Sequence, residues 1–416
     1  MRFLALLATV LPVWALACTA FKHTRDGRTL VGCNEDAWSI NAQVRFVPGG
    51  KGEHGAIYFA HYNGSPLRIM TDQMGMNTAG LVFDGLVLAP GAVKRRSSLP
   101  WMETSDAVAR AMRTCATVQE VATYLRTQDA GPLNGMLFFC DAGGEYLIVE
   151  PDTMFVGKDP WYALSNWRMS TCGDPATIPI PRLQVGLKVL SAGEGNDLDV
   201  ATEALERMAV CRERMGEGTL FSALFDVEAR MVHLYFYHDF SQAVVIDLEE
   251  ELAKGPHTVE MASLFGPRPE FERLRDHLTP FHQRWLWWGL AGLGVVALLG
   301  GLWAMALFFF WVFVVVRTRS LRTGLPWFVV GAGSVLMIFL VGLLLMVEGV
   351  YYFGLGDAVD KVHPLLRWAP LALMVCTGWM LIRSHTGARL RVPLRVLAGT
   401  QLVLLGCLLY WGMLWP

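Results

Sequence analysis

Charged side chains are scarce in this chain: only 17% of its 416 residues are Asp, Glu, Lys or Arg, whereas 53% are hydrophobic. Such a composition is too apolar for an ordinary soluble protein and indicates membrane segments. The formal net charge of −2 at pH 7 also leaves no basic excess for contacts with phosphates. We therefore expect no nucleic-acid partner.

Cysteine motifs are missing as well, because the eight cysteines have no spacing typical of a zinc site, and the sequence has neither an internal repeat nor a low-complexity tract. Six cysteines precede the apolar part of the chain, where disulfides are chemically allowed if that region is exported. Their pairing cannot be read from the sequence. They are Cys18, Cys33, Cys115, Cys140, Cys172 and Cys211.

The first 17 residues have the pattern of a secretory signal peptide: a basic start, an apolar stretch, and small residues at Ala15 and Ala17. Cleavage after Ala17 would make Cys18 the first residue of the mature protein. A lipoprotein signal is the alternative, because such signals also end before a cysteine, although they usually carry Leu where Ala15 stands. The two outcomes exclude each other, since a lipidated Cys18 has neither a free thiol nor a free amine.

Four apolar stretches end the chain, within residues 285–416, and each is near or above the length that crosses a bilayer, although the third is short. Buried helices of a large soluble domain are the alternative. Arginines cluster after the first stretch and before the fourth, so both loops are predicted to be cytoplasmic. The polar region then lies on the extracytoplasmic (periplasmic or outer) side, and the helices anchor it in membrane lipid. The spans are about 285–316, 327–352, 368–382 and 396–415.

Residues 18–255 alternate between short β-branched or aromatic segments and amphipathic ones. The Asp26-Gly27 pair predicts a tight hairpin between the first two strands. Strands in two groups with helices between them predict an α+β domain of four αββα layers, in which two sheets pack face to face under helices. One helix is expected over 198–215, and the proline-containing segment 256–284 is interpreted as a linker.

A cysteine exposed at the N-terminus combines a thiol nucleophile with an α-amine whose pKa is about 7.7–8.0 in unstructured chains. The amine can serve as the base that deprotonates the thiol, so that no separate histidine is required. The run C-T-A-F at 18–21, followed by G-C-N-E-D-A-W at 32–38, resembles the choloylglycine hydrolase and penicillin V acylase family of N-terminal-nucleophile hydrolases. Members of this family hydrolyse linear amides.

The resemblance covers residues 18–255 and implies a role for five residues. Cys18 would be the nucleophile, and Asp36 would hold its amine. Asn166, in L-S-N, and the backbone N–H of Val87, after G-M-N-T-A-G-L-V-F-D-G-L, would stabilise the oxyanion, and Arg182 matches a second active-site arginine. From the residues alone, other readings stay open: a strand-end aspartate, a turn asparagine and an exposed arginine at a helix start.

The sequence departs from the family at Cys33, which stands where most members have an arginine beside the nucleophile, and Ala37 displaces the motif tryptophan by one position. An arginine would favour the thiolate by its charge, whereas a neutral thiol would not. Asp84 reads as an aspartate on the polar side of a strand. The scattered histidines, His61 and His238 among them, read as ordinary strand or loop residues.

The resemblance implies a membrane-anchored, exported hydrolase of linear, non-peptide amide C–N bonds, whose substrate is a small-molecule N-acyl amide. It requires no cofactor and no metal. Two alternatives remain: an acyltransferase on the same scaffold, and a catalytically degenerate ligand-binding or sensory domain, which Cys33 and the helical tail would suit. Neither the substrate nor the oligomeric state follows from the sequence.

The predicted topology can be tested with alkaline phosphatase fusions, which are active only outside the cytoplasm. Because an even number of spans returns the chain to its starting side, we expect activity for a fusion after Pro416 and none for a fusion after Arg322. The reverse pattern would contradict the model.

Overall fold

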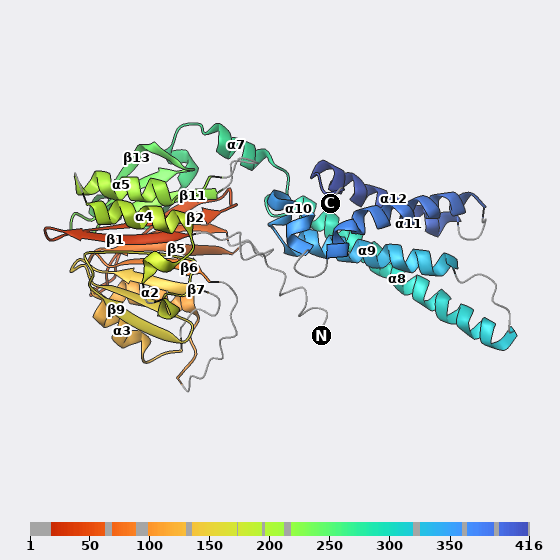
Figure 1. Cartoon of the computed structure of the whole chain (residues 1–416), viewed down its shortest axis with the longest axis horizontal. Helices are drawn as coiled ribbons and strands as arrows, with labels where there is room; N and C mark the ends of the chain where they lie inside the picture. The colour runs from red at the N-terminus through yellow and green to blue at the C-terminus, as the bar shows by residue number, and fades with distance from the viewer. Residues whose placement is uncertain are drawn as a thin grey trace. The chain divides into compact units, whose positions relative to one another are not determined.

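The structure is a computed structural model, and it describes residues 18–62, 69–88, 99–129, 135–172, 174–193, 196–211, 218–318, 325–359, 364–386 and 391–414. The signal peptide expected over 1–17 lies outside these residues. The chain forms two compact units, which divide between His277 and Leu278 (Figure 1).

The first unit contains two antiparallel sheets. The six-stranded sheet has the order β10-β1-β2-β11-β12-β13 and the eight-stranded sheet the order β14-β3-β4-β5-β6-β7-β8-β9. The strands of the first sheet are β1 (Thr19–Arg25), β2 (Arg28–Ala37), β10 (Trp161–Ser165), β11 (Gly218–Asp226), β12 (Met231–Phe236) and β13 (Asp239–Asp247). Those of the second are β3 (Gln43–Val47), β4 (Ala56–Tyr62), β5 (Met70–Asn77), β6 (Val82–Val87), β7 (Gly135–Cys140), β8 (Tyr146–Glu150), β9 (Thr153–Gly157) and β14 (His257–Glu260).

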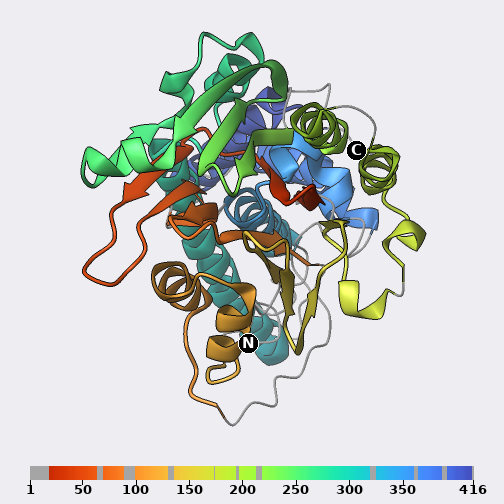
Figure 2. The ribbon, with the colours of Figure 1, turned by 90° about the vertical axis from the view of Figure 1, so that its left-hand side faces the viewer.

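Helices cover the outer face of each sheet. The helices α4 (Pro181–Ala192) and α5 (Asp197–Met208) pack on the six-stranded sheet, and α2 (Thr104–Thr114) and α3 (Val118–Leu125) pack on the eight-stranded sheet. Figures 1 and 2 show the two helix pairs on opposite sides of the strands. Between the sheets, the ring of Phe59 lies 6.1 Å from that of Phe221. The predicted four-layer αββα domain is therefore confirmed.

This layering explains the hydrophobicity of the central strands. The strands β2 and β11 are buried along almost their whole length, because the second sheet covers one face and helices cover the other. The helix α2 buries only one stripe, formed by Ala107, Val108, Ala111 and Met112, at the spacing of one helix face.

The first hairpin forms where its sequence predicts it. Arg25 pairs with Arg28 across a two-residue turn. Asp26 and Gly27 have φ values of 50° and 82°, which suit a type I′ turn and favour glycine at the second position.

The helix expected over 198–215 is shorter than predicted. The helix α5 ends at Met208, and Ala209 is already extended. The reason is tertiary, because the carbonyl of Val210 accepts a hydrogen bond from the N–H of Thr219, 2.7 Å away, which draws the chain toward the start of β11. Residues 212–217 lie outside the described part of the chain.

The segment 256–284, interpreted above as a linker, extends the first unit. Its residues 257–260 form β14, which pairs with β3 at the edge of the eight-stranded sheet. After a short 3₁₀ helix, Met261–Leu264, the helix α7 (Pro269–Asp276) buries Phe271 and Leu274. The prolines therefore begin or flank short elements, and the first unit continues to His277. The preceding helix, α6, spans Leu248–Ala253.

The second unit is helical. Four of its helical segments are long and apolar enough to cross a membrane: Arg284–Arg317, Trp327–Met346, Pro364–His385 and Arg391–Tyr410. The second ends before the predicted residue 352, because a turn at residues 348–349 separates α9 from α10. The helices are α8 (Arg284–Thr318), α9 (Leu325–Met346), α10 (Val350–Val359), α11 (Ala369–Thr386) and α12 (Arg391–Tyr410), with a 3₁₀ helix at Pro364–Trp368.

The new boundary predicts that a fragment of residues 18–277 is more stable than a fragment of residues 18–255. The shorter fragment lacks the β14 ladder and the buried side chains of Met261, Phe271 and Leu274. Because a buried apolar side chain contributes about 1.5–3 kcal/mol, the loss should exceed about 3 kcal/mol in the free energy of unfolding. Urea unfolding of both fragments measures it, and equal midpoints would contradict the boundary.

Candidate active site

Cys18 immediately precedes β1 and lies opposite β2 in the antiparallel ladder. Since Thr19 pairs with Asn34, the next opposing residue is Glu35. The Sγ of Cys18 lies 3.5 Å from Oε2 of Glu35, and Cys18 is only 2% exposed. The thiol therefore faces a carboxylate inside the fold.

This setting opposes ionisation of the thiol in the described chain. Burial raises the pKa of Cys18 well above its usual value, and the charges of Glu35 and Asp36 raise it further. The backbone N–H of Asp36 acts in the opposite direction and lowers it. A base or a cation is needed at this position before Cys18 can act as a nucleophile.

Asp36 lies on β2 and is 1% exposed. Its Oδ1 accepts a hydrogen bond of 2.5 Å from the hydroxyl of Thr219, at the start of β11. The same hydroxyl accepts a bond of 2.8 Å from the N–H of Val210. A hydroxyl of the neighbouring strand β11 thus holds the Asp36 carboxylate. Asp36 follows directly after Glu35, the residue that contacts Cys18.

Asn166 and Val87 come from different sheets but meet in the structure. Asn166 follows β10, and its Nδ2 donates to the carbonyl oxygen of Val87, at the end of β6, over 2.7 Å. A side-chain amide has two hydrogens, so this bond leaves one of them for another acceptor. Val87 is 37% exposed, which makes this edge accessible.

Arg182, near the start of α4, connects Asn166 with Cys18 through the hydroxyl of Ser165. Its Nη2 donates to Oδ1 of Asn166 over 3.3 Å and to Oγ of Ser165 over 2.9 Å. Ser165 in turn donates to the backbone carbonyl of Cys18 over 3.2 Å. Because the guanidinium can only donate, it fixes the Asn166 oxygen toward itself and the Nδ2 group toward Val87.

The five residues named from the sequence therefore converge. Cys18 and Asp36 lie on the first hairpin, and Asn166 and Arg182 reach Cys18 through Ser165. Val87 joins the group through Asn166. Ser165 and Thr219 are two further contributors, which sequence reasoning missed because a single hydroxyl on a strand carries no motif.

Glu35 and His61 were also missed. Nε2 of His61, on β4, lies 2.8 Å from Oε1 of Glu35, and its Nδ1 lies 2.7 Å from the carbonyl oxygen of Tyr62. That carbonyl can only accept, so the geometry favours a hydrogen on Nδ1, with Nε2 turned toward the Glu35 carboxyl group. His61, which reads as an ordinary strand residue in the sequence, thus faces the carboxyl group that lies beside Cys18.

The alternation of side chains could have indicated part of this cluster. On β2, Cys33 and Glu35 share one face, and the pairing with β1 puts Cys18 on that face too. Glu35, a glutamate in a buried strand opposite the expected nucleophile, was the sequence signal that could have indicated this part of the cluster. No sequence pattern indicated that β4 would supply His61 from the other sheet.

Cys33 faces the second sheet as well. Burial raises the pKa of its thiol well above the usual value, and the charge of Asp84 on β6 raises it further. Asp84 is not on a polar side of its strand, because both its carboxylate oxygens are buried. Cys33 pairs with Ala20 and is only a diagonal neighbour of Cys18. Diagonal pairs are about 7–8 Å apart, which is too far for a disulfide without a backbone shift.

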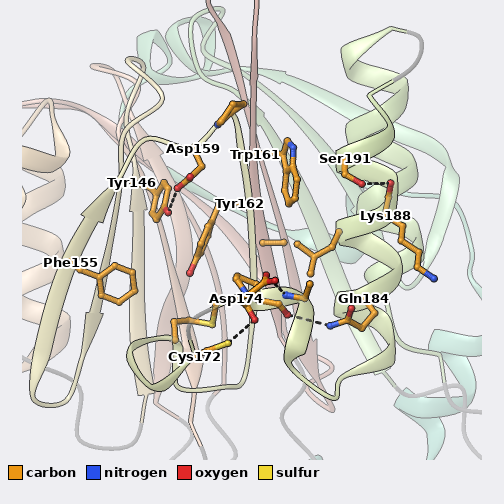
Figure 3. A pocket seen from close by; sticks show the side chains of 16 residues that line it. Tyr146, Phe155, Asp159, Trp161, Tyr162, Cys172, Asp174, Gln184, Lys188 and Ser191 are labelled. Atoms are coloured by element: carbon orange, nitrogen blue, oxygen red, sulfur yellow. Dashed lines mark hydrogen bonds between the residues drawn. The ribbon is translucent and has the colours of Figure 1, made fainter.

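A cavity of about 680 Å³ lies beside this group but contains none of the five residues (Figure 3). It is lined by the first half of β10 and by the later turns of α4, whereas Ser165, Asn166 and Arg182 lie at the opposite ends of these elements. The aromatic rings of Tyr146 and Tyr162 stack at 4.4 Å on one side. Polar side chains, among them Asp159, Asp174 and Lys188, also line it, so the cavity is a mixed polar and apolar space alongside the candidate site.

No family model and no curated protein matches the chain. Among solved structures, it is similar to a variant of conjugated bile acid hydrolase from Clostridium perfringens, with 15% identity, a TM-score of 0.47, and coverage of 61% of this chain and 99% of that one. A second variant of the same hydrolase gives 16% identity, a TM-score of 0.46, and coverage of 60% and 99%.

Penicillin V acylase from Agrobacterium tumefaciens is a further similar structure, with 15% identity, a TM-score of 0.44, and coverage of 56% of this chain and 87% of that one. At these identities the likeness concerns the fold, so the chemistry has to come from the side chains themselves.

Asp84 generates a prediction about pH. Burial raises its pKa well above the usual value, and the charge of Glu35 adds to this. The folded chain therefore keeps a proton that the unfolded chain loses above about pH 3.9. Stability should fall as the pH rises from that value toward the raised pKa.

Asp84→Asn should remove this loss, so the variant should be more stable than the parent at pH 8, and the difference should shrink toward pH 4. Unfolding free energies of both proteins across this range measure the effect. Asp26→Asn, at the exposed hairpin turn, is the matched control and should follow the parent curve. Parallel curves for Asp84→Asn and the parent would refute the prediction.

Proposed function

We propose that this chain is an exported, membrane-anchored hydrolase of linear amides, with Cys18 as an N-terminal nucleophile. The observation that carries the proposal is the convergence of Cys18, Asn166, Arg182 and Val87 through the hydroxyl of Ser165 and the amide of Asn166. Asp36 lies next to Glu35 on β2, and its charge acts on the Cys18 thiol. These are the residues that the family resemblance names. Their arrangement supplies a nucleophile and an amide donor on adjoining strands.

The first step is activation of the thiol. Removal of residues 1–17 frees the α-amine of Cys18, which takes the proton from Sγ and becomes an ammonium. The carboxylates of Glu35 and Asp36 oppose the thiolate but favour the ammonium that forms beside them. The acidic surroundings therefore support an amine base attached to the same residue.

The thiolate then attacks the amide carbonyl of a small N-acyl substrate. The free N–H of Asn166 Nδ2 and the backbone N–H of Val87 stabilise the oxyanion, while Arg182 keeps the amide in the donating orientation. The tetrahedral intermediate collapses, the ammonium returns its proton to the leaving amine, and a thioester remains on Sγ. Water hydrolyses the thioester and restores the thiol. No metal or organic cofactor takes part in these steps.

An acyltransferase would use the same steps, with an amine in place of water as the acceptor. A catalytically degenerate binding domain is the second candidate, and a specific observation favours it. Cys33 occupies the position of the family arginine and lies beside Asp84 instead of offering a positive charge to the nucleophile. Turnover of an N-acyl amide panel separates the two classes.

The location is part of the proposal. Four apolar helices support a membrane protein, and the sequence pattern of residues 1–17 supports export. In this proposal the hydrolase unit lies on the extracytoplasmic side, and the helices contact lipid. The proposal includes no nucleic-acid partner.

Substitution of Cys18 tests the mechanism. Cys18→Ala should lower turnover at least about 1,000-fold, as expected for loss of a nucleophile. The thermal midpoint should change little, because a single thiol is removed. Cys115→Ala, at a buried thiol of the helix-covered core, is the control and should keep its activity.

The amine has its own test. Mass spectrometry of the purified protein should show an unmodified Cys18 at the N-terminus. A variant that keeps Met before Cys18 should be nearly inactive, having lost the free base. Full activity of that variant or of Cys18→Ala, or a lipid on Cys18, would falsify the mechanism.

A further inference from the structure

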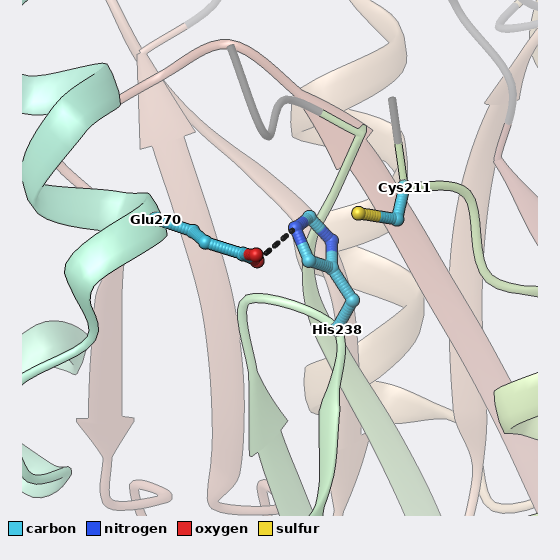
Figure 4. Close-up of side chains that lie close together, drawn as sticks. All are labelled: Cys211, His238 and Glu270. Carbon is cyan, nitrogen blue, oxygen red and sulfur yellow. Dashed lines mark ion pairs between the residues drawn. The ribbon is translucent and has the colours of Figure 1, made fainter. Parts of the chain in front are cut away.

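Cys211, His238 and Glu270 lie close together in the first unit, and none of them is among the five residues of the proposed active site (Figure 4). Each residue offers one ligand atom: the thiol sulfur of Cys211, a ring nitrogen of His238 and a carboxylate oxygen of Glu270. These three atoms all lie within 4.8 Å of one another. Nε2 of His238 is 3.8 Å from Oε2 of Glu270. The three residues come from three separate segments, so their meeting is a product of the fold.

His238 occupies an unusual backbone position. It follows Tyr237 in the turn between β12 and β13, where Phe236 pairs with Asp239. Both turn residues have positive φ values, 54° for Tyr237 and 51° for His238. Asn and Gly are favoured in such two-residue turns, and bulky side chains rarely adopt these angles. The surrounding fold thus holds His238 at a backbone position that few non-glycine residues adopt, which is a reason to suspect a function.

The helix that carries Glu270 is fixed against this turn. Arg268 forms an ion pair with Asp239, at the start of β13. The ring of Phe271 packs edge-on against the rings of Phe236 and Tyr237, with centroids 4.8 Å and 5.2 Å apart. Glu270 lies between Arg268 and Phe271 in the chain, so its carboxylate approaches His238 from an anchored helix.

The third segment is held by backbone bonds. Cys211 forms an antiparallel bridge with Gly218, and the N–H of Thr219 donates to the carbonyl of Val210 over 2.7 Å. Val210 also donates its N–H to the Thr219 hydroxyl that binds Asp36. The cysteine therefore projects from backbone that the six-stranded sheet positions.

We propose that Cys211, His238 and Glu270 bind a divalent transition-metal ion of the zinc class. A thiolate, an imidazole and a carboxylate are ligands that Zn²⁺ accepts together, whereas Mg²⁺ and Ca²⁺ require oxygen ligands. Three protein ligands leave a fourth tetrahedral position for water or an outside ligand. Binding converts the Cys211 thiol to a metal thiolate and releases its proton to solvent.

The spacing of these residues explains why no motif indicates the site. Cys211, His238 and Glu270 are separated by 26 and 31 intervening residues (238 − 211 − 1 and 270 − 238 − 1). No short ligand pair is present, because each ligand stands on a different element. Only the packing of α7 on the β12–β13 turn brings Glu270 to His238.

Zinc binding to the full-length chain in detergent tests the proposal. The protein is stripped with a chelator, kept under reductant, and titrated with Zn²⁺ by calorimetry. Co²⁺ serves as a spectroscopic probe, because a thiolate ligand gives a sulfur-to-cobalt charge-transfer band. We expect one Zn²⁺ per chain, a sulfur-to-cobalt band, and a higher thermal midpoint with metal than without it.

Three variants keep the shape of the site while removing a ligand. They are Cys211→Ser, His238→Asn, whose asparagine tolerates the positive φ, and Glu270→Gln. Each should weaken Zn²⁺ affinity at least about tenfold, and Cys211→Ser should abolish the cobalt band. Cys172→Ser, at another thiol of the same unit, is the control and should bind as the parent does.

The thermal midpoints of the metal-free variants show whether each has folded. If a ligand variant unfolds, the parent and the Cys172→Ser control still test the proposal. A sulfur-to-cobalt band in both shows that a thiolate other than Cys172 binds the metal. Stoichiometric binding that persists in folded Cys211→Ser and His238→Asn would overturn the proposal, as would a parent protein that binds no Zn²⁺. Neither result depends on amidase activity, so the test is independent of the proposed function.

Discussion

The register of β1 between β2 and β10 is the constraint on which the candidate site depends. Side chains alternate between the two faces of a strand, so a slip by one residue would turn Cys18 away from Glu35. The buried amide of Asn34 opposes such a slip. It donates to the Thr19 hydroxyl and to the Leu205 carbonyl, over 3.1 Å and 3.0 Å, and it accepts from Ser222 over 2.6 Å. Moving the strand would break these bonds inside the fold.

The same register has an electrostatic consequence. It places Glu35 and Cys33 in the space between the sheets, where β6 contributes Asp84 and β4 contributes His61. Carboxylates in this space repel one another and are poorly solvated, so protons are retained there. Burial raises the pKa of both the Cys18 thiol and the Asp84 carboxyl for this reason. A cysteine in this setting needs a base within reach to form a thiolate, and in the proposed mechanism the α-amine of Cys18 is that base.

Some features were predictable because the interactions are local. The Asp26-Gly27 turn specifies its own backbone angles, and the apolar stripe of α2 specifies a helix with one buried face. Other predictions failed where distant residues intervened. The helix α5 ends at Met208 because the N–H of Thr219 donates a hydrogen bond to the carbonyl of Val210. Residues 257–260 form a strand because they pair with the edge of β3. Neither event leaves a signal in the segment that it changes.

The sequence by itself determined the apolar helices, the two groups of strands with helices between them, and the five residues implied by the resemblance. It did so because hydrophobic periodicity, turn chemistry and motif spacing are properties of short segments. Only the tertiary structure decided which side chains meet. His61 faces Glu35, Asp84 lies beside Cys33, and Glu270 approaches His238 because sheets and helices bring residues together from distant parts of the chain. The physical reason is that contacts between layers depend on the register and packing of whole elements, which no single segment encodes.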